Sequence, residues 1–179
     1  MRRFLVVPLL VLTAFALVPP AGAATPAPYC GIRWGSLSKQ ADAFTGSPVT
    51  NVRSGRHDCF DRLVVDLAGP VGGYRVKYVS QVEEDGSGRP IPLAGGAFLR
   101  VVVLAPAYGE NGPTYSPADP AHVVNVDGDR TFRQVAWAGS FEGQTTLGLG
   151  VRARLPFRVL KLNGPGAGSR IVVDVAHRW

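Results

Sequence analysis

The chain has 179 residues, of which 46% are hydrophobic and 18% are charged, and its formal net charge at pH 7 is +6. No long polar or charged stretch divides it, so the sequence predicts one domain with its own core rather than several domains. The 22 glycines and 15 prolines recur too often for helices of ten residues, which excludes an all-helical protein and favours short strands joined by turns.

The N-terminal segment predicts a secretory signal peptide. Residues 1–3 are Met-Arg-Arg, residues 4–18 are apolar, and residues 21–23 are Ala-Gly-Ala before the expected cleavage after Ala23. The apolar run is about 15 residues long and contains Pro8, whereas a membrane-spanning helix needs about 20. We therefore expect a secreted or envelope-associated protein that is not inserted in the membrane after cleavage. Without the two N-terminal arginines, 17 basic residues face 13 acidic ones, and this net charge of +4 suits an anionic envelope without identifying a ligand.

The chain has two cysteines, Cys30 and Cys59. In an exported chain this even count favours a disulfide between them, and the alternative is a pair of reduced or metal-binding thiols. A disulfide would tie an N-terminal extension, residues 24–48, to the domain formed by residues 49–179. The chain-entropy model gives such a loop about 3 kcal/mol of stabilisation.

The predicted strands are short β-branched runs separated by turn signals such as Gly69-Pro70. One short helical turn is expected near Ser36. Short connections between the strands predict an all-β fold, a two-sheet antiparallel β-sandwich. The strands are expected at residues 50–54, 60–67, 74–82, 98–104, 122–126, 131–141, 147–160 and 171–176.

Residues 106–120 form the longest predicted connection. They include Tyr108, Glu110 and Tyr115 among several prolines and glycines. Connections above the usual length are commonly functional or mobile, so this segment is either a binding loop or a flexible one.

The most regular pattern lies at residues 147–159, where every odd position is apolar and the even positions are glycine, arginine or proline. A period of two predicts one long strand with one face in the core and the other in water. The wet face would carry Arg152, Arg154 and Arg158, here called the arginine row. On such a strand Arg152 and Arg154 would lie about 7 Å apart.

The arginine row is the candidate ligand-binding site, and Arg53 and Arg56 could extend it. Guanidinium groups suit bidentate contacts with the carboxylates of peptide stems or with envelope phosphates. Exposed aromatic residues such as Tyr108 or Trp137 could stack on sugar rings. The alternative interpretation is that the arginines protect an edge strand from aggregation.

Two predicted strands are nearly identical in sequence. Arg-Leu-Val-Val-Asp-Leu at residues 62–67 and Arg-Ile-Val-Val-Asp-Val at residues 170–175 each place an arginine and an aspartate on one face, four positions apart. This similarity suggests two related sheet elements packed by pseudo-symmetry. Arginine and aspartate are too far apart to pair within one strand, so the pattern predicts charge pairs with neighbouring strands.

Three segments in this order carry a family resemblance: RHDCFDRLVVDL at residues 56–67, LGVRARLPFRV at residues 149–159 and RIVVDVAH at residues 170–177. Together they resemble the AMIN-like domain of secreted actinobacterial proteins, and the cysteine pair resembles that branch too. The family is similar to the AMIN domain of cell-wall amidases, a non-catalytic β-sandwich of two related sheets that binds peptidoglycan. The resemblance runs from about residue 49 to the C-terminus and implies an envelope-binding module. Unlike the amidases, the chain leaves no room for a catalytic domain.

The histidines give no catalytic motif. A zinc amidase needs histidines and a carboxylate gathered at one metal, whereas His57, His122 and His177 lack such spacing. A triad with a serine such as Ser140 would need a Gly-x-Ser-x-Gly elbow, which the sequence lacks. A hydrolase centred on His57 is therefore the least favoured function.

The acidic clusters are also interpreted as turns or loops. Asp127-Gly128-Asp129 lacks the alternating ligands of a calcium loop and predicts a hairpin turn. Glu83-Glu84-Asp85 precedes glycines and predicts a solvated loop rather than a glycosidase pair. We therefore expect no enzyme, no metal and no cofactor.

Two functions remain after these exclusions. The first is a non-catalytic module that binds peptidoglycan or another anionic wall polymer. The second is a protein-interaction module that recruits an envelope partner through a sheet edge or through residues 106–120. Nucleic acid is not an expected partner, because the chain is exported and its basic residues lack an aromatic stacking platform.

Overall fold

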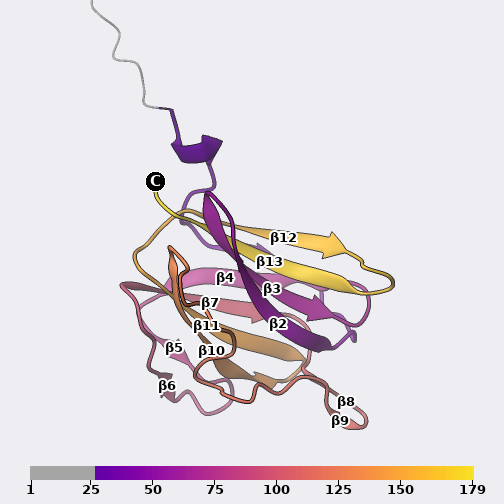
Figure 1. Cartoon of the computed structure of the whole chain (residues 1–179). Helices are drawn as coiled ribbons and strands as arrows, with labels where there is room; N and C mark the ends of the chain where they lie inside the picture. Colours follow the sequence, from indigo (N-terminus) through magenta and orange to yellow (C-terminus); the bar gives the residue numbers. More distant parts are fainter. Residues whose placement is uncertain (1–26) are drawn as a thin grey trace, which may run out of the picture.

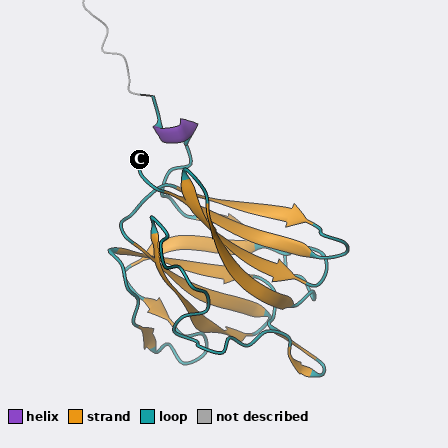
Figure 2. Cartoon of the chain, viewed as in Figure 1, coloured by secondary structure: helices purple, strands orange, loops and turns teal. Residues whose placement is uncertain are grey.

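The computed structural model describes residues 27–179 (Figure 1). The predicted signal peptide therefore lies outside the described residues. Within them the chain is all-β, and the one helical element of this part is the 3₁₀ turn η1 (Tyr29–Gly31) (Figure 2). No helix in the described part is long and apolar enough to cross a membrane.

Two antiparallel sheets pack face to face, which confirms the predicted sandwich. The larger sheet has the order β1 (Lys39–Ala41), β4 (Tyr74–Val79), β7 (Ala97–Val103), β11 (Gln144–Val151) and β10 (Phe132–Phe141). The smaller sheet has the order β12 (Phe157–Asn163), β13 (Ser169–Ala176), β3 (Phe60–Leu67) and β2 (Val49–Arg56). Two short hairpins join β5 (Val82–Glu83) to β6 (Pro90–Ile91) and β8 (Tyr108–Gly109) to β9 (Gly112–Pro113). The strand predicted over residues 74–82 is thus divided between β4 and β5.

The core lies between the two sheets and is built from alternate residues of each strand. On β3, Leu63 and Val65 are fully buried, and on β11 Leu147 and Leu149 are fully buried in the same cluster. Burying an aliphatic side chain of this size contributes about 1.5–3 kcal/mol. This alternation explains why the β-branched runs form strands in the predicted places.

The two similar strands, β3 and β13, pair with each other in the smaller sheet. Their antiparallel register places Arg62 opposite Asp174 and Asp66 opposite Arg170. Arg62 donates two hydrogen bonds to Asp174, at 2.7 and 2.9 Å. Asp66 instead accepts hydrogen bonds from Arg53 on β2, at 2.8 and 3.0 Å. The predicted charge pairs between neighbouring strands are therefore present.

The long strand predicted over residues 147–159 is wrong. β11 ends at Val151 in the larger sheet, β12 begins at Phe157 in the smaller sheet, and the residues between them cross from one sheet to the other. The glycines of β11 do not face water but a second layer of chain on the outer side of the sheet. A Cβ built on Gly150 would lie 2.0 Å from the carbonyl oxygen of Ala94. Gly150 is thus approached by another backbone, and Gly148 is approached by the side chains of Leu93 and Val82.

The connection between β7 and β10, residues 104–131, closes one side of the sandwich. The Val123 amide donates to the Val135 carbonyl at 2.8 Å, so the connection covers the outer edge of β10. Ser54 of β2 donates to a carbonyl of the same connection at 3.1 Å. Residues 122–126, predicted as a strand, are therefore a loop that contacts both sheets. The β8–β9 hairpin projects from this connection (Figure 1).

The opposite side is closed by residues 29–45, here called the strap. The disulfide between Cys30 and Cys59 fixes the beginning of the strap, as predicted. Further along, the Gly35 carbonyl accepts a hydrogen bond from the Phe157 amide of β12 at 2.9 Å. The strap then pairs with β4 as strand β1. It therefore connects the free edges of the two sheets.

Candidate functional site

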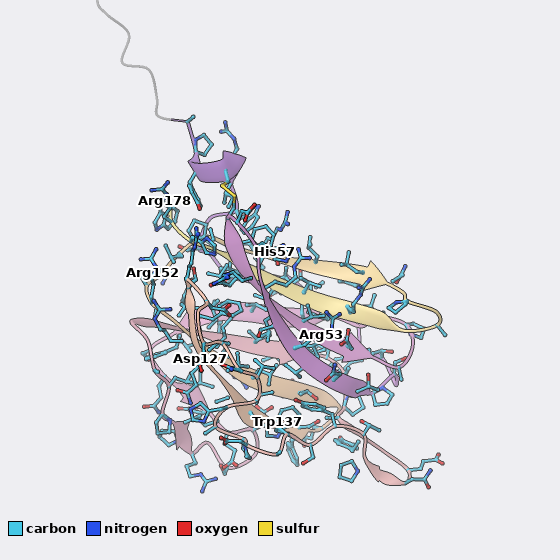
Figure 3. The ribbon with its side chains drawn as sticks, viewed as in Figure 1. Arg53, His57, Asp127, Trp137, Arg152 and Arg178 are labelled. Atoms are coloured by element: carbon cyan, nitrogen blue, oxygen red, sulfur yellow. A yellow bond between two sulfur atoms is a disulfide. The ribbon has the colours of Figure 1, made fainter. Side chains whose placement is uncertain are left out.

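The residues predicted to bind a ligand do not form one surface. Figure 3 shows Arg53, Trp137 and Arg152 on different parts of the molecule. The members of the arginine row do not share a strand: Arg152 and Arg154 lie between β11 and β12, and Arg158 lies on β12. Each of the predicted residues also contacts other parts of the chain.

Arg158 holds the strap and a buried aspartate together. Its Nε donates to Asp174 at 2.8 Å, and Arg62 binds the same carboxylate from the neighbouring strand. The Asp174 side chain is fully buried. The Arg158 guanidinium also lies 4.4 Å from the ring centroid of Trp34 in the strap. The hydrogen bond to Asp174 raises the pKa of Arg62 above its ordinary value.

Arg152 and Arg154 lie in the crossing between β11 and β12. Arg152 donates to the carbonyl oxygen of His177. Arg154 donates to the carbonyl oxygen of Ser36 at 3.2 Å, and its guanidinium lies 5.0 Å from the Tyr78 ring centroid. Ser36 lies in a bend and not in a helical turn, so the turn predicted there is wrong. The two arginines fasten the crossing to the C-terminal segment and to the strap.

Arg53 and Arg56, on β2, are engaged with neighbouring groups. Arg53 pairs with Asp66, and the hydrogen bond to that carboxylate raises the pKa of Arg53. Arg56 donates to the Gly128 carbonyl at 2.7 Å and thereby joins β2 to the connection that covers β10. Neither arginine lies beside the arginine row.

The two aromatic candidates differ in exposure. Trp137 is half-buried and packs against Tyr115, with ring centroids 5.5 Å apart. Tyr108 is 41% exposed, and its hydroxyl accepts a hydrogen bond from the Gly143 amide at 3.0 Å. Of the two, Tyr108 presents the more open ring to solvent.

Asp61 and His177 form a buried pair at one end of the sandwich. Asp61 accepts hydrogen bonds from the amides of Thr131 and Phe132, at 2.5 and 3.2 Å. Its other carboxylate oxygen lies 3.0 Å from Nε2 of His177. These contacts join β3 to the beginning of β10 and to the C-terminal segment. The pair is closed off from solvent, which favours a structural role.

The other histidines lie elsewhere. His57 stacks on Phe60 with ring centroids 4.5 Å apart, and His122 lies 3.0 Å from Asp119 on the surface. The described part of the chain contains no group of three or more His, Cys, Asp or Glu residues that could hold a metal ion.

Asp129 lies near the Asp61 carboxylate. Burial, together with the negative charge of Asp61, raises the pKa of Asp129 from 3.8 to about 6. The positive charges of Arg56, His177 and Arg133 act in the opposite direction. One carboxylate oxygen of Asp129 is buried and has no hydrogen-bond partner in the described part of the chain.

This raised pKa predicts that the fold gains stability as the pH falls through about 6. The folded state holds the Asp129 proton more tightly than the unfolded state does, so ionisation above that pH destabilises the fold. Asp129 is partly exposed and screened by solvent, so we expect the effect to be about 1 kcal/mol. Asp129→Asn should therefore be more stable than the wild type at pH 7.5 and nearly equal to it at pH 4.5.

Urea unfolding at the two pH values measures this difference. Asp127→Asn, an exposed position in the same turn, is the matched control. An Asp129→Asn effect of equal size at both pH values would contradict the prediction.

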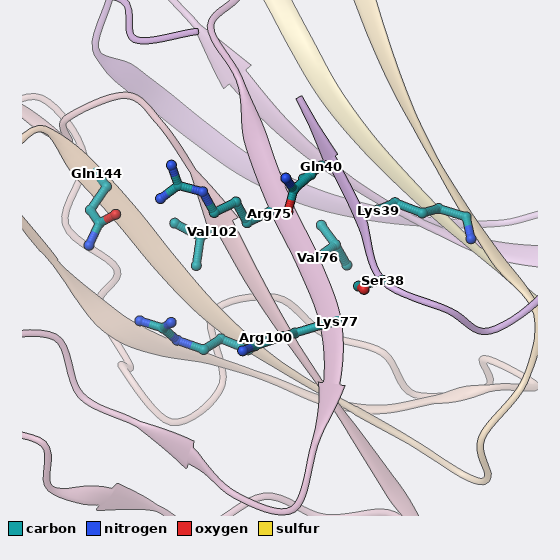
Figure 4. A pocket seen from close by; sticks show the side chains of 9 residues that line it. All are labelled: Ser38, Lys39, Gln40, Arg75, Val76, Lys77, Arg100, Val102 and Gln144. Atoms are coloured by element: carbon teal, nitrogen blue, oxygen red, sulfur yellow. The ribbon is translucent and has the colours of Figure 1, made fainter. Parts of the chain in front are cut away.

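A groove of about 390 Å³ crosses the outer face of the larger sheet (Figure 4). It lies over β1, β4, β7 and the beginning of β11. In the strand register Gln40 is opposite Arg75, and Lys77 is opposite Arg100. Figure 4 shows Arg75 and Arg100 extending in the same direction, toward Gln144. The polar residues of the lining are Ser38, Lys39, Gln40, Arg75, Lys77, Arg100 and Gln144.

The groove is basic and partly uncompensated. Arg75 contacts the exposed Asp42 at 3.0 Å, an ion pair of a kind that contributes only about 0–1 kcal/mol. Arg100 contacts the buried Asp85 at 2.9 Å. The Lys77 side chain forms no hydrogen bond or ion pair within residues 27–179. Asp85 compensates the charge of Arg100, so Lys77 is the cation of this cross-strand pair that has no acidic partner in the described part of the chain.

A second hollow of about 420 Å³ shares Lys77 and Arg100 with the groove. It continues beyond the end of β4, where Ser80 and Gln81 line it, and it reaches Glu83 of β5. The two hollows adjoin at Lys77 and Arg100, on the outer face of β4 and β7. Sequence reasoning did not find this surface, because its residues come from separate segments that only the strand register brings together.

Comparison with protein-family models assigns most of the chain to a family. A family model described as AMIN-like domain matches residues 47–177. No curated protein and no solved structure matches the chain. The matched region contains β2 through β13 and leaves out the strap, which supplies Ser38 and Gln40 to the groove.

Proposed function

The chain belongs to the AMIN-like domain family, and from this premise we propose that it is a non-catalytic module that binds peptidoglycan or another anionic wall polymer. The observation that carries the proposal is the family match over residues 47–177, because an AMIN-like domain is a cell-wall-associated module. The disulfide between Cys30 and Cys59 fits an extracellular protein.

The electrostatics of the surface support an anionic ligand. The basic groove on the larger sheet leaves Lys77 without a partner inside the described chain, and Arg100 keeps donors that Asp85 does not use. A surface of this kind attracts anionic polymers.

The buried polar groups support a non-catalytic role. Asp61 and His177 are the most buried carboxylate and imidazole pair of the described residues, and their partners are backbone groups and each other. A group closed off from solvent in this way has no route to a polymeric substrate.

We expect the purified protein to cosediment with isolated sacculi. Binding should saturate and should weaken as salt is raised from 20 to 500 mM, where the Debye length falls from about 20 to about 4 Å. The measurement is the protein fraction in the pellet, with tubes lacking sacculi as the control. Absence of binding at the lowest salt would contradict the proposal.

The arginine row is tested in the same experiment. Arg152→Ala/Arg154→Ala removes contacts to the His177 and Ser36 carbonyls, so we expect a lower melting temperature. Retention on sacculi at a temperature where the variant is folded should be unchanged. Loss of retention by the folded variant would show that the arginine row is part of the ligand-binding site.

A second function, recruitment of an envelope protein, is favoured by the hairpin that projects from residues 104–131 (Figure 1). Tyr108 on this hairpin is 41% exposed. Crosslinking in an envelope extract should then recover a stoichiometric partner from the wild type and not from Tyr108→Ser. Recovery of no such partner would count against this second function.

A further inference from the structure

We propose that the groove over β1, β4 and β7 binds the phosphate groups of an extended phosphodiester polymer. This inference rests on the proposed function and names the site and the ligand chemistry within it. Neither the family match nor the sequence pattern assigns these residues to a ligand.

The side chains that line the groove favour an anionic ligand. The charged side chains that face the groove, Arg75, Lys77 and Arg100, only donate hydrogen bonds. The acidic partners of the two arginines, Asp42 and Asp85, are outside its lining. No aromatic residue lines the groove, so it offers no platform for stacking on a sugar ring.

The arrangement of the cations then favours phosphate over carboxylate. Arg75 and Lys77 are alternate residues on one face of β4, about 7 Å apart at the rise of a strand. Arg100 lies opposite Lys77 on β7, where side chains of a cross-strand pair begin about 5 Å apart. The three cations therefore project from neighbouring positions on one face of the sheet. A tetrahedral phosphate can accept from all of them, whereas a planar carboxylate pairs best with one guanidinium.

The combined extent of the groove and the second hollow favours a polymer over a single ion. The groove and the second hollow share Lys77 and Arg100, and together they follow β4 and continue to Ser80 and Gln81. Glu83 lines the far hollow and limits the basic stretch in that direction. A chain with one phosphate at Lys77 and Arg100 would place its next groups beside Arg75 on one side and beside neutral polar groups on the other.

The strap supplies one wall of the site from outside the matched region. Ser38 and Gln40 face the groove, while the Lys39 ammonium points away and lies 4.3 Å from the ring centroid of Phe157. Burial lowers the pKa of the Lys39 ammonium. This alternation fixes which face of the strap the ligand meets. Because Ser38 and Gln40 lie outside the matched residues 47–177, an AMIN-like domain without a strap would lack this wall of the groove.

The test uses the purified protein and two soluble probes, poly(glycerol phosphate) and poly-L-glutamate with matched numbers of charges. Arg75→Gln/Lys77→Gln should weaken binding of the phosphate polymer at least tenfold, since charge-assisted hydrogen bonds are lost. Lys161→Gln, an exposed lysine on β12, is the control for a change of charge and should alter binding less than twofold. Arg100 is left in place because it neutralises the buried Asp85.

The contribution of the strap is tested by placing a negative charge in it. Gln40→Glu should weaken binding of the phosphate polymer at least fivefold, because the new carboxylate lies opposite Arg75. Ala167→Glu, in the exposed turn between β12 and β13, is the matched control and should leave binding unchanged.

The possible results of these experiments test the groove and the proposed wall-binding function separately. Tighter binding of poly-L-glutamate than of the phosphate polymer would overturn the phosphate assignment. Sacculus binding that survives Arg75→Gln/Lys77→Gln would overturn the groove and leave the wall-binding function standing. Groove-dependent binding of the phosphate polymer by a protein that does not bind sacculi would support the site and refute peptidoglycan as the ligand.

Discussion

Asp174→Ala should lower the free energy of unfolding by about 3–5 kcal/mol, which is the range for breaking a buried ion pair from one side. The Asp174 carboxylate is fully buried between Arg62 and Arg158, and it accepts three hydrogen bonds from them at 2.7, 2.9 and 2.8 Å. Its removal leaves two neighbouring guanidinium groups without a counter-charge. The loss is a large part of the 5–15 kcal/mol by which a domain is typically stable.

The equivalent aspartate of the similar strand provides the control. Asp66 pairs with Arg53, but the arginine side chain is 48% exposed, so Asp66→Ala should cost only about 1 kcal/mol or less. Urea unfolding of the three proteins measures both values. Equal losses for the two variants would show that burial does not set the strength of these charge pairs.

Gly150→Ala should destabilise the fold by about 3 kcal/mol or more, the upper range for overpacking a core. The added Cβ would lie 2.0 Å from the Ala94 carbonyl oxygen, which is backbone and cannot rotate away. Either the outer layer separates from the sheet or β11 shifts within it. Thermal unfolding followed by circular dichroism measures the loss.

Gly55→Ala on β2 gives the opposite expectation. A Cβ at Gly55 meets nothing within 4 Å, so the substitution should stabilise the protein by about 0.5–1 kcal/mol through reduced backbone freedom in the unfolded chain. Destabilisation by Gly55→Ala as large as that by Gly150→Ala would refute the argument from close approach.

Strands with one face in the core and the other face outside it could be predicted from the sequence. β3 occupies residues 60–67 as predicted, because Leu63, Val65 and Leu67 alternate along the face that enters the core. The same rule failed at residues 147–159, because the period of two continues through a change of sheet. Gly148 and Gly150 were interpreted as positions in water, although their lack of a side chain instead permits contact with the outer layer.

The candidate site could not be predicted because it depends on strand order. Arg75 and Lys77 are visible in the sequence as alternate residues of one strand, but nothing local places them beside Arg100. That proximity follows from the pairing of β4 with β7, and the strap joins them only through the pairing of β1 with β4. Arg152 and Arg154, the most distinctive arginines in the sequence, donate hydrogen bonds to the carbonyl oxygens of His177 and Ser36, contacts that no local pattern predicts.

The order of strands in the smaller sheet also sets when the protein can fold. β2 and β3 come from the first half of the chain, β12 and β13 come from its end, and Arg62 and Asp174 are 112 residues apart. Closing so long a loop slows folding, and synthesis delivers β3 long before its partner exists. Until β13 emerges, β3 presents an unpaired edge that other chains could bind. The fold is therefore completed only once β13 has been made, and before that the chain passes through an interval in which contact with other copies could lead to aggregation.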